Sequence, residues 1–421
     1  MLRRTIDRSL FEQMLEKLEQ GVYPQWVMTD PEIFELEKER IFGHTWLYLA
    51  HETELKKPGD FVTRWMVHDP VLLVKNRDGE IKAFLNSCTH RGTILCAADR
   101  GNSRAFTCPY HGWTFNMDGE LIDVVAGDRL YGDKMKRHEW NLRPIPRVES
   151  YHGLIFGNLD PNAMPLTEYL GDMKWYLDIL LKRSDGGVEV RGTPQRWLVK
   201  ANWKNTFENF TADTYHVQRG HGLSVVQARD GSFPWQATPP EARPMFERNL
   251  APDQVELLKR TIVFVGGVFP NFCFLSPVHR AGEHMHNYLT VRIWRPVGPE
   301  QVEVWSWFLI DKAFPEDYKE EAYQGYLATF GPSGTLEQDD TEVWARVVEA
   351  NRGLMVQDKD LSYNNVSNYL LGYGHIERDE SFIGPGIAFP CTYNDHLARS
   401  IHRYWLELMM DETAPSGEGR R

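Results

Sequence analysis

Four residues between Cys88 and Trp113 have the types and the spacing to bind a metal. One residue separates Cys88 from His90, two separate Cys108 from His111, and seventeen lie between the two pairs. Two cysteines and two histidines that converge nearly always bind a metal. The chemistry expected of this stretch is therefore metal coordination.

Two kinds of centre take this set of donors. One is a structural zinc bound by Cys2His2; the other is a Rieske [2Fe–2S] cluster, in which two histidines replace two cysteines on one iron. Zinc fingers usually pair Cys with Cys and His with His along the chain, whereas here each loop offers one of each. The pattern favours a Rieske cluster, with zinc as the alternative, bound by Cys88, His90, Cys108 and His111. Cys96, Cys273 and Cys391 have no such partners and are interpreted as packing residues.

A cluster moves single electrons and makes no bonds, so an oxygenase that used it would need a second metal with open positions, such as iron on two histidines and a carboxylate. ENFTADTYHVQRGH supplies candidates. At about 100° per residue, Asn209, Asp213 and His216 lie in one stripe of a helix. The glycines on both sides of His221 can turn it back toward His216. Two surface histidines at a helix end are the alternative.

The carboxylate is chosen by helical phase. EQDD at 337–340 opens a helix, where acids are also favourable for structural reasons. Three, four, seven and eight residues beyond Asp340 the side chains are apolar (Val343, Trp344, Val347 and Val348). Asp339 instead shares a face with Glu342 and Arg346. Asp340 is predicted to face inward and to be the metal ligand.

The elements that carry these residues have different periods. Residues 1–40 have helical spacing, with Leu10, Phe11, Met14 and Leu18 on one face. From about 45 to 160 the period is two, and hairpins are predicted at Asp78-Gly79 and Asp118-Gly119. The first metal-binding pair follows one hairpin and the second pair precedes the other, which predicts a small β domain with two metal-bearing loops.

After residue 160 the sequence pattern changes to a mixture of helices and strands. A helix is predicted at 203–217, strands at 286–294 and 301–310 with a turn at Pro299-Glu300, and a helix at 336–353. The predicted class is α+β, with helices on an antiparallel sheet. The predicted domains are 1–43 (N-terminal helical part of the catalytic domain), 44–160 (the metal-bearing β domain) and 161–421 (the catalytic mononuclear iron domain).

Composition limits the partners. The 421 residues carry a net charge of −12 and no basic block, which opposes nucleic-acid binding. Acids interrupt the N-terminal stretch, unlike a signal peptide, and the apolar stretch at 261–275 is too short to span a bilayer. An odd count of five cysteines argues against a disulfide framework. We predict a cytoplasmic protein without nucleic-acid or membrane partners.

Both motifs resemble one family. The Cys-x-His and Cys-x-x-His pairs, with CPYHGW and Arg91-Gly92, resemble the Rieske domain of aromatic-ring-hydroxylating oxygenases. ENFTADTYHVQRGH and FGPSGTLEQDD resemble the mononuclear-iron motif and carboxylate segment of naphthalene- and biphenyl-type dioxygenase α subunits, whose second Asp binds iron. The resemblance implies an all-β Rieske domain inserted into a helix-grip-like catalytic domain.

It also implies a function. The expected protein is the terminal oxygenase α subunit of a multicomponent dioxygenase, which uses O2 and two electrons to cis-dihydroxylate an aromatic substrate. Each subunit would carry one [2Fe–2S] cluster and one mononuclear Fe(II). No GxGxxG fingerprint follows a strand, so electrons must come from a separate ferredoxin or NAD(P)H-dependent reductase, or both. The implied assembly is α3, or α3β3 with a small β subunit.

Three alternatives stay open: a Rieske monooxygenase or demethylase, a zinc-stabilised binding protein without redox chemistry, and a pure electron-transfer Rieske protein. The last leaves the Asp/His/His set without a role.

The remaining candidates have catalytic or lining roles. Asn209 and Asp213 are predicted catalytic residues. Because metal-bound histidines usually donate their outer N–H to a carboxylate, Asp213 is expected to accept a hydrogen bond from His216 and, across the implied ring of subunits, from His111 of its neighbour. Residues expected to line the substrate pocket, each of which could also be core, are Phe210, Val217, Phe330 and Leu336.

Overall fold

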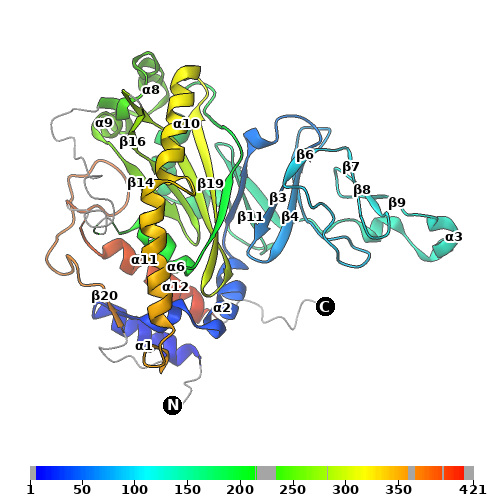
Figure 1. The fold of residues 1–421 in the computed structure, drawn as a ribbon, viewed down its shortest axis with the longest axis horizontal. Coiled ribbons are helices and arrows are strands. Elements are labelled where there is room, and N and C mark those ends of the chain that lie inside the picture. The colour runs from blue at the N-terminus through cyan, green and yellow to red at the C-terminus, as the bar shows by residue number, and fades with distance from the viewer. Residues whose placement is uncertain are drawn as a thin grey trace. The chain divides into compact units, whose positions relative to one another are not determined.

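The computed structural model describes residues 6–213, 215, 234–281, 283–358, 366–390 and 393–411. The chain divides into two compact units (Figure 1). The large unit contains Met1–Ile41 and Leu170–Arg421, and the small unit contains Phe42–Tyr169. The chain therefore starts in the large unit, builds the small one and returns. The predicted domain limits are 1–43, 44–160 and 161–421. They stay a prediction, because compact units are not the same as functional domains.

The small unit is built from antiparallel sheets. The first contains β10 (Arg147–Tyr151), β11 (Leu154–Asn158) and β2 (Leu47–His51). The second contains β5 (Ile81–Leu85), β4 (Asp69–Lys75), β3 (Asp60–Met66) and β6 (Arg100–Asn102). The third contains β7 (Ala105–Thr107), β8 (Thr114–Asn116) and β9 (Leu121–Asp123). The short helices α3 (Gly127–Tyr131) and α4 (Leu166–Leu170) follow. The predicted all-β character of this part is confirmed.

Both predicted hairpins form, and the same local chemistry makes both turns. Strand β4 pairs with β5, and β8 pairs with β9. Gly79 and Gly119 have φ of +85° and +79°, which glycine adopts without strain. The side-chain oxygen of Asn76 accepts two backbone N–H bonds across the first turn, and Asn116 does the same in the second. These turns fix the strands between which the metal-binding loops run.

The large unit contains an antiparallel sheet with helices packed on it (Figure 1). Its strand order is β12 (Val188–Val190), β19 (Gln301–Asp311), β18 (Leu289–Gly298), β15 (Phe272–Ser276) and β14 (Phe264–Val268), and β13 (Gln195–Val199) also pairs with β19. Strands β16 (Val278–Ala281) and β17 (His284–Asn287) form a separate hairpin. Its helices are α1 (Arg8–Glu19), α2 (Pro31–Glu37), α5 (Met173–Leu181), α6 (Trp203–Thr211), α8 (Arg243–Asn249), α9 (Pro252–Arg260), α10 (Glu316–Phe330), α11 (Thr335–Asn351) and α12 (His396–Met410).

The predicted α+β class is confirmed, as are the paired strands β18 and β19 with their turn at Pro299-Glu300. One difference concerns the start of β18. The sequence predicts one strand from 286, whereas 286–287 belong to β17 and β18 begins at Leu289. No helix in the described ranges has both the length and the apolar character needed to span a bilayer.

The N-terminal region is not helical throughout. The apolar face of α1 is buried as predicted, but β1 (Val22–Pro24) interrupts the expected helix at 1–40 and pairs with β20 (Val366–Asn368). Pairing between segments so far apart leaves no mark in local periodicity. The helical prediction for 1–40 was therefore wrong at 22–24, while α1 and α2 lie within the predicted range.

Helix α6 ends earlier than predicted. It stops at Thr211 instead of continuing to 217. The Asp213 carboxylate accepts a hydrogen bond from the Tyr215 backbone N–H at 3.0 Å, a turn that competes with helix continuation. Asp213 therefore lies beyond the helix, and the helical phase used to place it in a stripe with Asn209 does not apply.

A buried carboxylate ties α6 to both ends of the chain. Glu37, on α2, is fully buried and accepts hydrogen bonds from the Lys204 ammonium at 2.5 Å and from the indole N–H groups of Trp203 and Trp405 at 2.8 Å each. Burial lowers the pKa of Lys204, an effect that Glu37 opposes. Helices α2, α6 and α12 meet at this one side chain.

We expect Glu37→Ala to destabilise the large unit by about 3–5 kcal/mol, because it leaves a buried ammonium and two indole N–H groups without their acceptor. Chemical unfolding followed by tryptophan fluorescence measures the loss. Glu35→Ala is the control, since Glu35 pairs with Lys38 at an exposed position and should cost less than about 1 kcal/mol. Equal small losses would contradict the anchoring role.

Candidate metal centres

The loop after β5 carries Cys88 and His90, and its own backbone closes it. The Cys88 N–H donates to the Thr93 carbonyl at 2.9 Å, and the Gly92 N–H donates to the Cys88 carbonyl at 2.8 Å. Gly92 has φ of +76°, which lets the chain turn back after the histidine. The loop is thus a tight turn with its cysteine at the base.

The loop between β7 and β8 repeats this construction. The Cys108 N–H donates to the Trp113 carbonyl at 2.7 Å, and the Gly112 N–H donates to the Cys108 carbonyl at 3.0 Å. Gly112 has φ of +72°, and a Cβ there would lie 2.7 Å from the Val125 side chain. Two different sequences therefore build the same loop twice.

The loops bring the predicted quartet together in like pairs. Cys88 and Cys108 are each 2% exposed, and their thiols lie close enough to interact but form no disulfide. The imidazole rings of His90 and His111 have centroids 4.6 Å apart. His90 is half-buried and His111 is exposed. A thiol pair inside and an imidazole pair outside match the two irons of a Rieske cluster, each of which takes one kind of ligand.

The environment fits a bound cation. Burial raises the pKa of the Cys88 thiol, and the neighbouring Cys108 raises it further, so two bare thiolates are unfavourable here without a metal. Burial lowers the pKa of His90, with His111 and Arg91 adding to the effect. The neutral imidazole that results is the form that binds metals. The buried Nδ1 of His90 has no hydrogen-bond partner in the described part of the chain.

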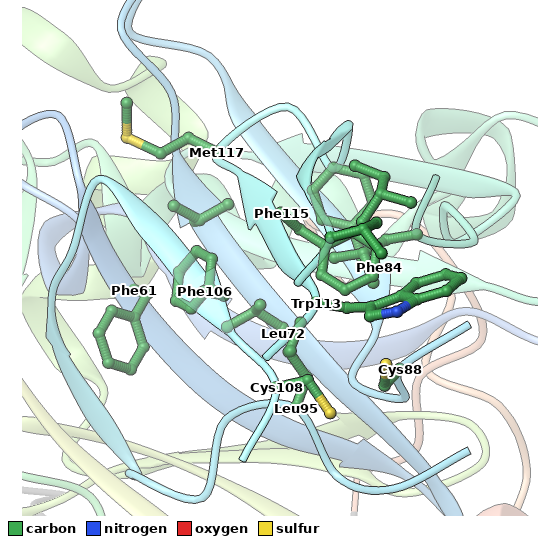
Figure 2. Close-up of a cluster of buried hydrophobic side chains, with 14 residues drawn as sticks. Phe61, Leu72, Phe84, Cys88, Leu95, Phe106, Cys108, Trp113, Phe115 and Met117 are labelled. Atoms are coloured by element: carbon green, nitrogen blue, oxygen red, sulfur yellow. The ribbon is translucent and has the colours of Figure 1, made fainter. Parts of the chain in front are cut away.

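Aromatic side chains support the quartet from one side. The Trp113 ring stacks on His90 with centroids 4.6 Å apart and planes 8° from parallel. Figure 2 shows Cys88 and Cys108 at the edge of a buried apolar cluster that includes Trp113, Phe115 and other side chains of the small unit. The apolar cluster holds the thiols away from water, and the imidazoles lie on the solvent side.

Helix α11 presents the predicted carboxylate inward. Asp340 is 7% exposed and Asp339 is exposed, so the predicted orientation is confirmed. Trp344 and Val348 continue the buried face, but Val343 is 53% exposed and does not belong to it. The buried face of α11 is therefore narrower than the face formed by the four apolar positions that the sequence predicted.

The partners proposed for Asp340 lie outside the described residues. His216, His221 and the pocket candidate Val217 all fall within 216–233, which the structure does not describe. Within the described ranges, no three His, Cys, Asp or Glu side chains are grouped to hold one metal ion, the quartet included, because its thiols and its imidazoles lie as two separate pairs. The assignment of His216, His221 and Asp340 to one iron therefore stays a prediction.

The other predicted residues on or after α6 lie in an acidic neighbourhood. Asn209 is half-buried, and its side-chain oxygen has no hydrogen-bond partner among the described residues. Burial raises the pKa of Asp395, and the charges of Glu208 and Asp213 raise it further. Asp213 and Asp395 are thus near enough to interact. The catalytic roles of Asn209 and Asp213 stay predictions.

Two pocket candidates come together. The rings of Phe210 and Phe330 have centroids 6.3 Å apart, and Phe210 also packs against Trp294 at 5.5 Å. Leu336 is half-buried. Their pocket role stays a prediction.

Sequence reasoning missed the charged pair beside these rings. The guanidinium of Arg292 lies 5.0 Å from the Phe210 ring and 5.3 Å from the Phe330 ring, and donates to Glu337 at 2.5 Å. Arg292 is fully buried and Glu337 is 1% exposed. One signal could have found it: an arginine inside the apolar strand LTVRIW, because a buried charge requires a partner.

Two protein-family models match this chain, one over most of the small unit and the other over most of the large unit. Residues 45–136 match the family described as the Rieske [2Fe-2S] domain, and residues 166–411 match the ring hydroxylating alpha subunit (catalytic domain).

Curated relatives of two activities are similar over nearly the whole chain. The α subunit of an N,N-dimethyl phenylurea N-demethylase from a Sphingobium species is 32% identical over 96% of this chain and 95% of its own length. The α subunit of benzene 1,2-dioxygenase from Pseudomonas putida is 32% identical over 97% of this chain and 95% of its own.

A solved structure is similar as well. Naphthalene 1,2-dioxygenase from a Rhodococcus species, bound to indole, superposes with a TM-score of 0.91 at 38% identity, covering 96% of this chain and 98% of that one.

Proposed function

Because the chain belongs to the family of ring-hydroxylating oxygenase α subunits, with a Rieske [2Fe–2S] domain and a catalytic domain of the kind that binds a mononuclear iron, we propose that it adds both atoms of O2 to an aromatic hydrocarbon. Members of this family are terminal oxygenases that work with a ferredoxin or reductase. The observation that carries the proposal is the pair of loops that bring two buried thiols together and two imidazoles within 4.6 Å.

The proposed ligands divide between the two centres. In the small unit the cluster would be held by Cys88, His90, Cys108 and His111. In the large unit the iron would be held by His216, His221 and Asp340. When bound, the cluster would supply electrons one at a time, and an iron held by three protein ligands would have open positions for O2.

The chain's own groups prepare this reaction. The exposed imidazole of His111 would be available for contact with a neighbouring subunit, and the apolar packing around Cys88 and Cys108 would keep water from the thiols. The reaction adds O2, two electrons and two protons to one ring double bond, which yields a cis-dihydrodiol. The protons must enter through polar groups, and the proposed catalytic residues Asn209 and Asp213 lie on and just beyond α6.

Charge near the proposed pocket favours an apolar substrate. Arg292 lies beside Phe210 and Phe330, but it already donates to Glu337 and to the Phe330 carbonyl. An arginine with these acceptors is not offered to a substrate carboxylate. Among the described residues beside these rings, this favours an aromatic hydrocarbon over an aromatic acid.

Oxidative N-demethylation is the second candidate, because one of the relatives is the α subunit of an N-demethylase. That reaction places one oxygen atom on a methyl carbon and releases formaldehyde. Turnover under 18O2 separates the two. We expect naphthalene or biphenyl to give a diol with two labelled oxygens, whereas formaldehyde from N,N-dimethyl phenylurea and no diol from either hydrocarbon would favour the second candidate.

We also propose an α3 or α3β3 assembly in the cytoplasm, where NAD(P)H is available as the final reductant. In that assembly Asp213 would accept hydrogen bonds from His216 of its own chain and from His111 of a neighbouring copy. Asp213 lies two residues beyond the end of α6 and three residues before His216 in the sequence, which supports this role.

Asp213→Asn tests that role. The variant should keep both metals and the oligomer, because an amide preserves size and the acceptor oxygen for the Tyr215 N–H. Electron transfer should stop, since the charge that orients the histidines is lost. The measurement is reoxidation of the dithionite-reduced cluster in a single turnover with substrate and O2. Normal reoxidation in the variant, or full activity of a monomer, would rule the role out.

A further inference from the structure

Arg292 is a buried charge on β18, a central strand that pairs with β15 on one side and with β19 on the other. Its guanidinium donates through Nη1 to Glu337 at 2.5 Å and through Nη2 to the Phe330 carbonyl at 2.6 Å. The rings of Phe210 and Trp294 lie within 5.7 Å of it. One buried side chain of the sheet thus donates hydrogen bonds to two neighbouring helices, α10 and α11.

Those two points are the ends of one turn. Phe330 is the last residue of α10, and Glu337 lies in the first turn of α11. The turn between them is packed against its own backbone: a Cβ at Gly334 would lie 2.2 Å from the Thr329 carbonyl oxygen, and one at Gly331 would lie 2.7 Å from that of Leu327. Arg292 therefore fixes the sheet to a connection that has little room to move.

The fixed residue lies one helical turn before the proposed iron ligand. Glu337 and Asp340 are three residues apart on the buried face of α11, and Trp344 continues that face and packs against Trp294 at 5.4 Å. Burial raises the pKa of Glu337, the Asp340 charge raises it further, and Arg292 opposes both. The two carboxylates are therefore close enough to interact, with Arg292 as the compensating charge.

We propose that Arg292 and Glu337 are positioning residues that hold Asp340 in the place where it binds the mononuclear iron. The proposal rests on the proposed function, in which Asp340 is a ligand. A metal ligand must be held within about 0.5 Å of its productive position. The planar fork of arginine can do this because its two donors reach two acceptors in fixed directions.

Stability alone does not account for the pair. A buried ion pair often contributes no more than apolar residues of similar volume, and replacing both partners together is often neutral or stabilising. Replacing both therefore separates the two roles. A merely structural pair would leave iron binding unchanged in the folded double variant.

The test is Arg292→Met combined with Glu337→Leu. The protein should fold with its cluster absorption intact, while the affinity of the apo mononuclear site for Fe(II) falls by about 10- to 100-fold, the usual effect of losing a group that orients a ligand. The measurement is Fe(II) titration after selective removal of the mononuclear iron by a chelator. Unchanged affinity in the folded double variant would overturn the proposal.

A matched buried pair serves as the control. Arg183 and Asp311 are equally buried, 2.8 Å apart in the same unit, and neither is on α11. Arg183→Met with Asp311→Leu should leave Fe(II) affinity within about twofold, far less than the loss expected for an orienting group. If the Arg292 double variant does not fold, Arg292→Lys keeps the charge but presents a single ammonium instead of the fork. Its Fe(II) affinity should also fall, and wild-type affinity in that variant would overturn the proposal.

The inference and the proposed function fail in different ways. Iron retained in Asp340→Ala means that Asp340 is not a ligand, and the proposed function is then wrong at that residue. Iron lost in Asp340→Ala but kept in the Arg292/Glu337 double variant means that Asp340 binds iron without the pair's help. Only the inference fails in the second case.

Discussion

Asp340→Ala is expected to reduce turnover to background and to leave the mononuclear site empty of iron, while the visible spectrum of the cluster stays intact. Asp340 is the buried carboxylate of the EQDD segment. An iron with two histidines alone loses the anionic ligand that completes its protein coordination. Folding should not suffer, because the substitution also removes a negative charge near the buried Glu337. Metal analysis and product formation with naphthalene measure both effects.

Asp339→Ala is the matched control. Asp339 precedes Asp340 on the same helix but is exposed, so its loss should leave iron content and turnover near those of the unchanged protein. The reverse result, with Asp339→Ala inactive and Asp340→Ala active, would show that burial had selected the wrong carboxylate.

Cys108→Ala is expected to abolish the visible absorption and the low-field EPR signal of the reduced cluster, and with them all NAD(P)H-driven turnover. Cys108 is one of the two buried thiols that lie close together at the base of the paired loops. A cluster that loses one of four protein ligands is not retained, and structural metal binding in such loops is coupled to their folding. Absorption and EPR spectroscopy of the purified variant measure the loss.

Cys96→Ala is the control for that variant. Cys96 is a free, half-buried cysteine of the same unit, and it packs against the same apolar cluster. The spectrum should survive its replacement. A colourless unchanged protein that contains zinc would instead reject the cluster and favour the zinc-stabilised alternative.

The sequence alone determined what short-range chemistry controls. The hairpins at Asp78-Gly79 and Asp118-Gly119 could be read because an Asn and a Gly at fixed offsets define each turn within five residues. The inward direction of Asp340 followed in the same way, because helical phase needs no distant contact. The quartet of Cys88, His90, Cys108 and His111 could be predicted because a metal restricts the types and the spacing of its ligands.

The ends of helices and the pairing partners of strands depend on hydrogen bonds that form only in the folded chain. The sequence extends α6 to 217, but the Asp213 side chain takes the Tyr215 N–H and the helix stops at Thr211. Strand β1 exists because β20 pairs with it from more than 340 residues away. A helical or strand period cannot report either event, because both depend on which competing hydrogen bond the folded chain completes.

The contacts around the proposed iron ligand Asp340 could not be predicted from the sequence and are set by the tertiary structure. Arg292 stands in the sequence as one charge in an apolar strand, and Glu337 as one of several acids at a helix start. Only the packing of α10 and α11 beside β18 brings them to 2.5 Å. The physical reason is that a buried charge is tolerated only where another element supplies its partner, and the choice of that element is a property of the whole fold.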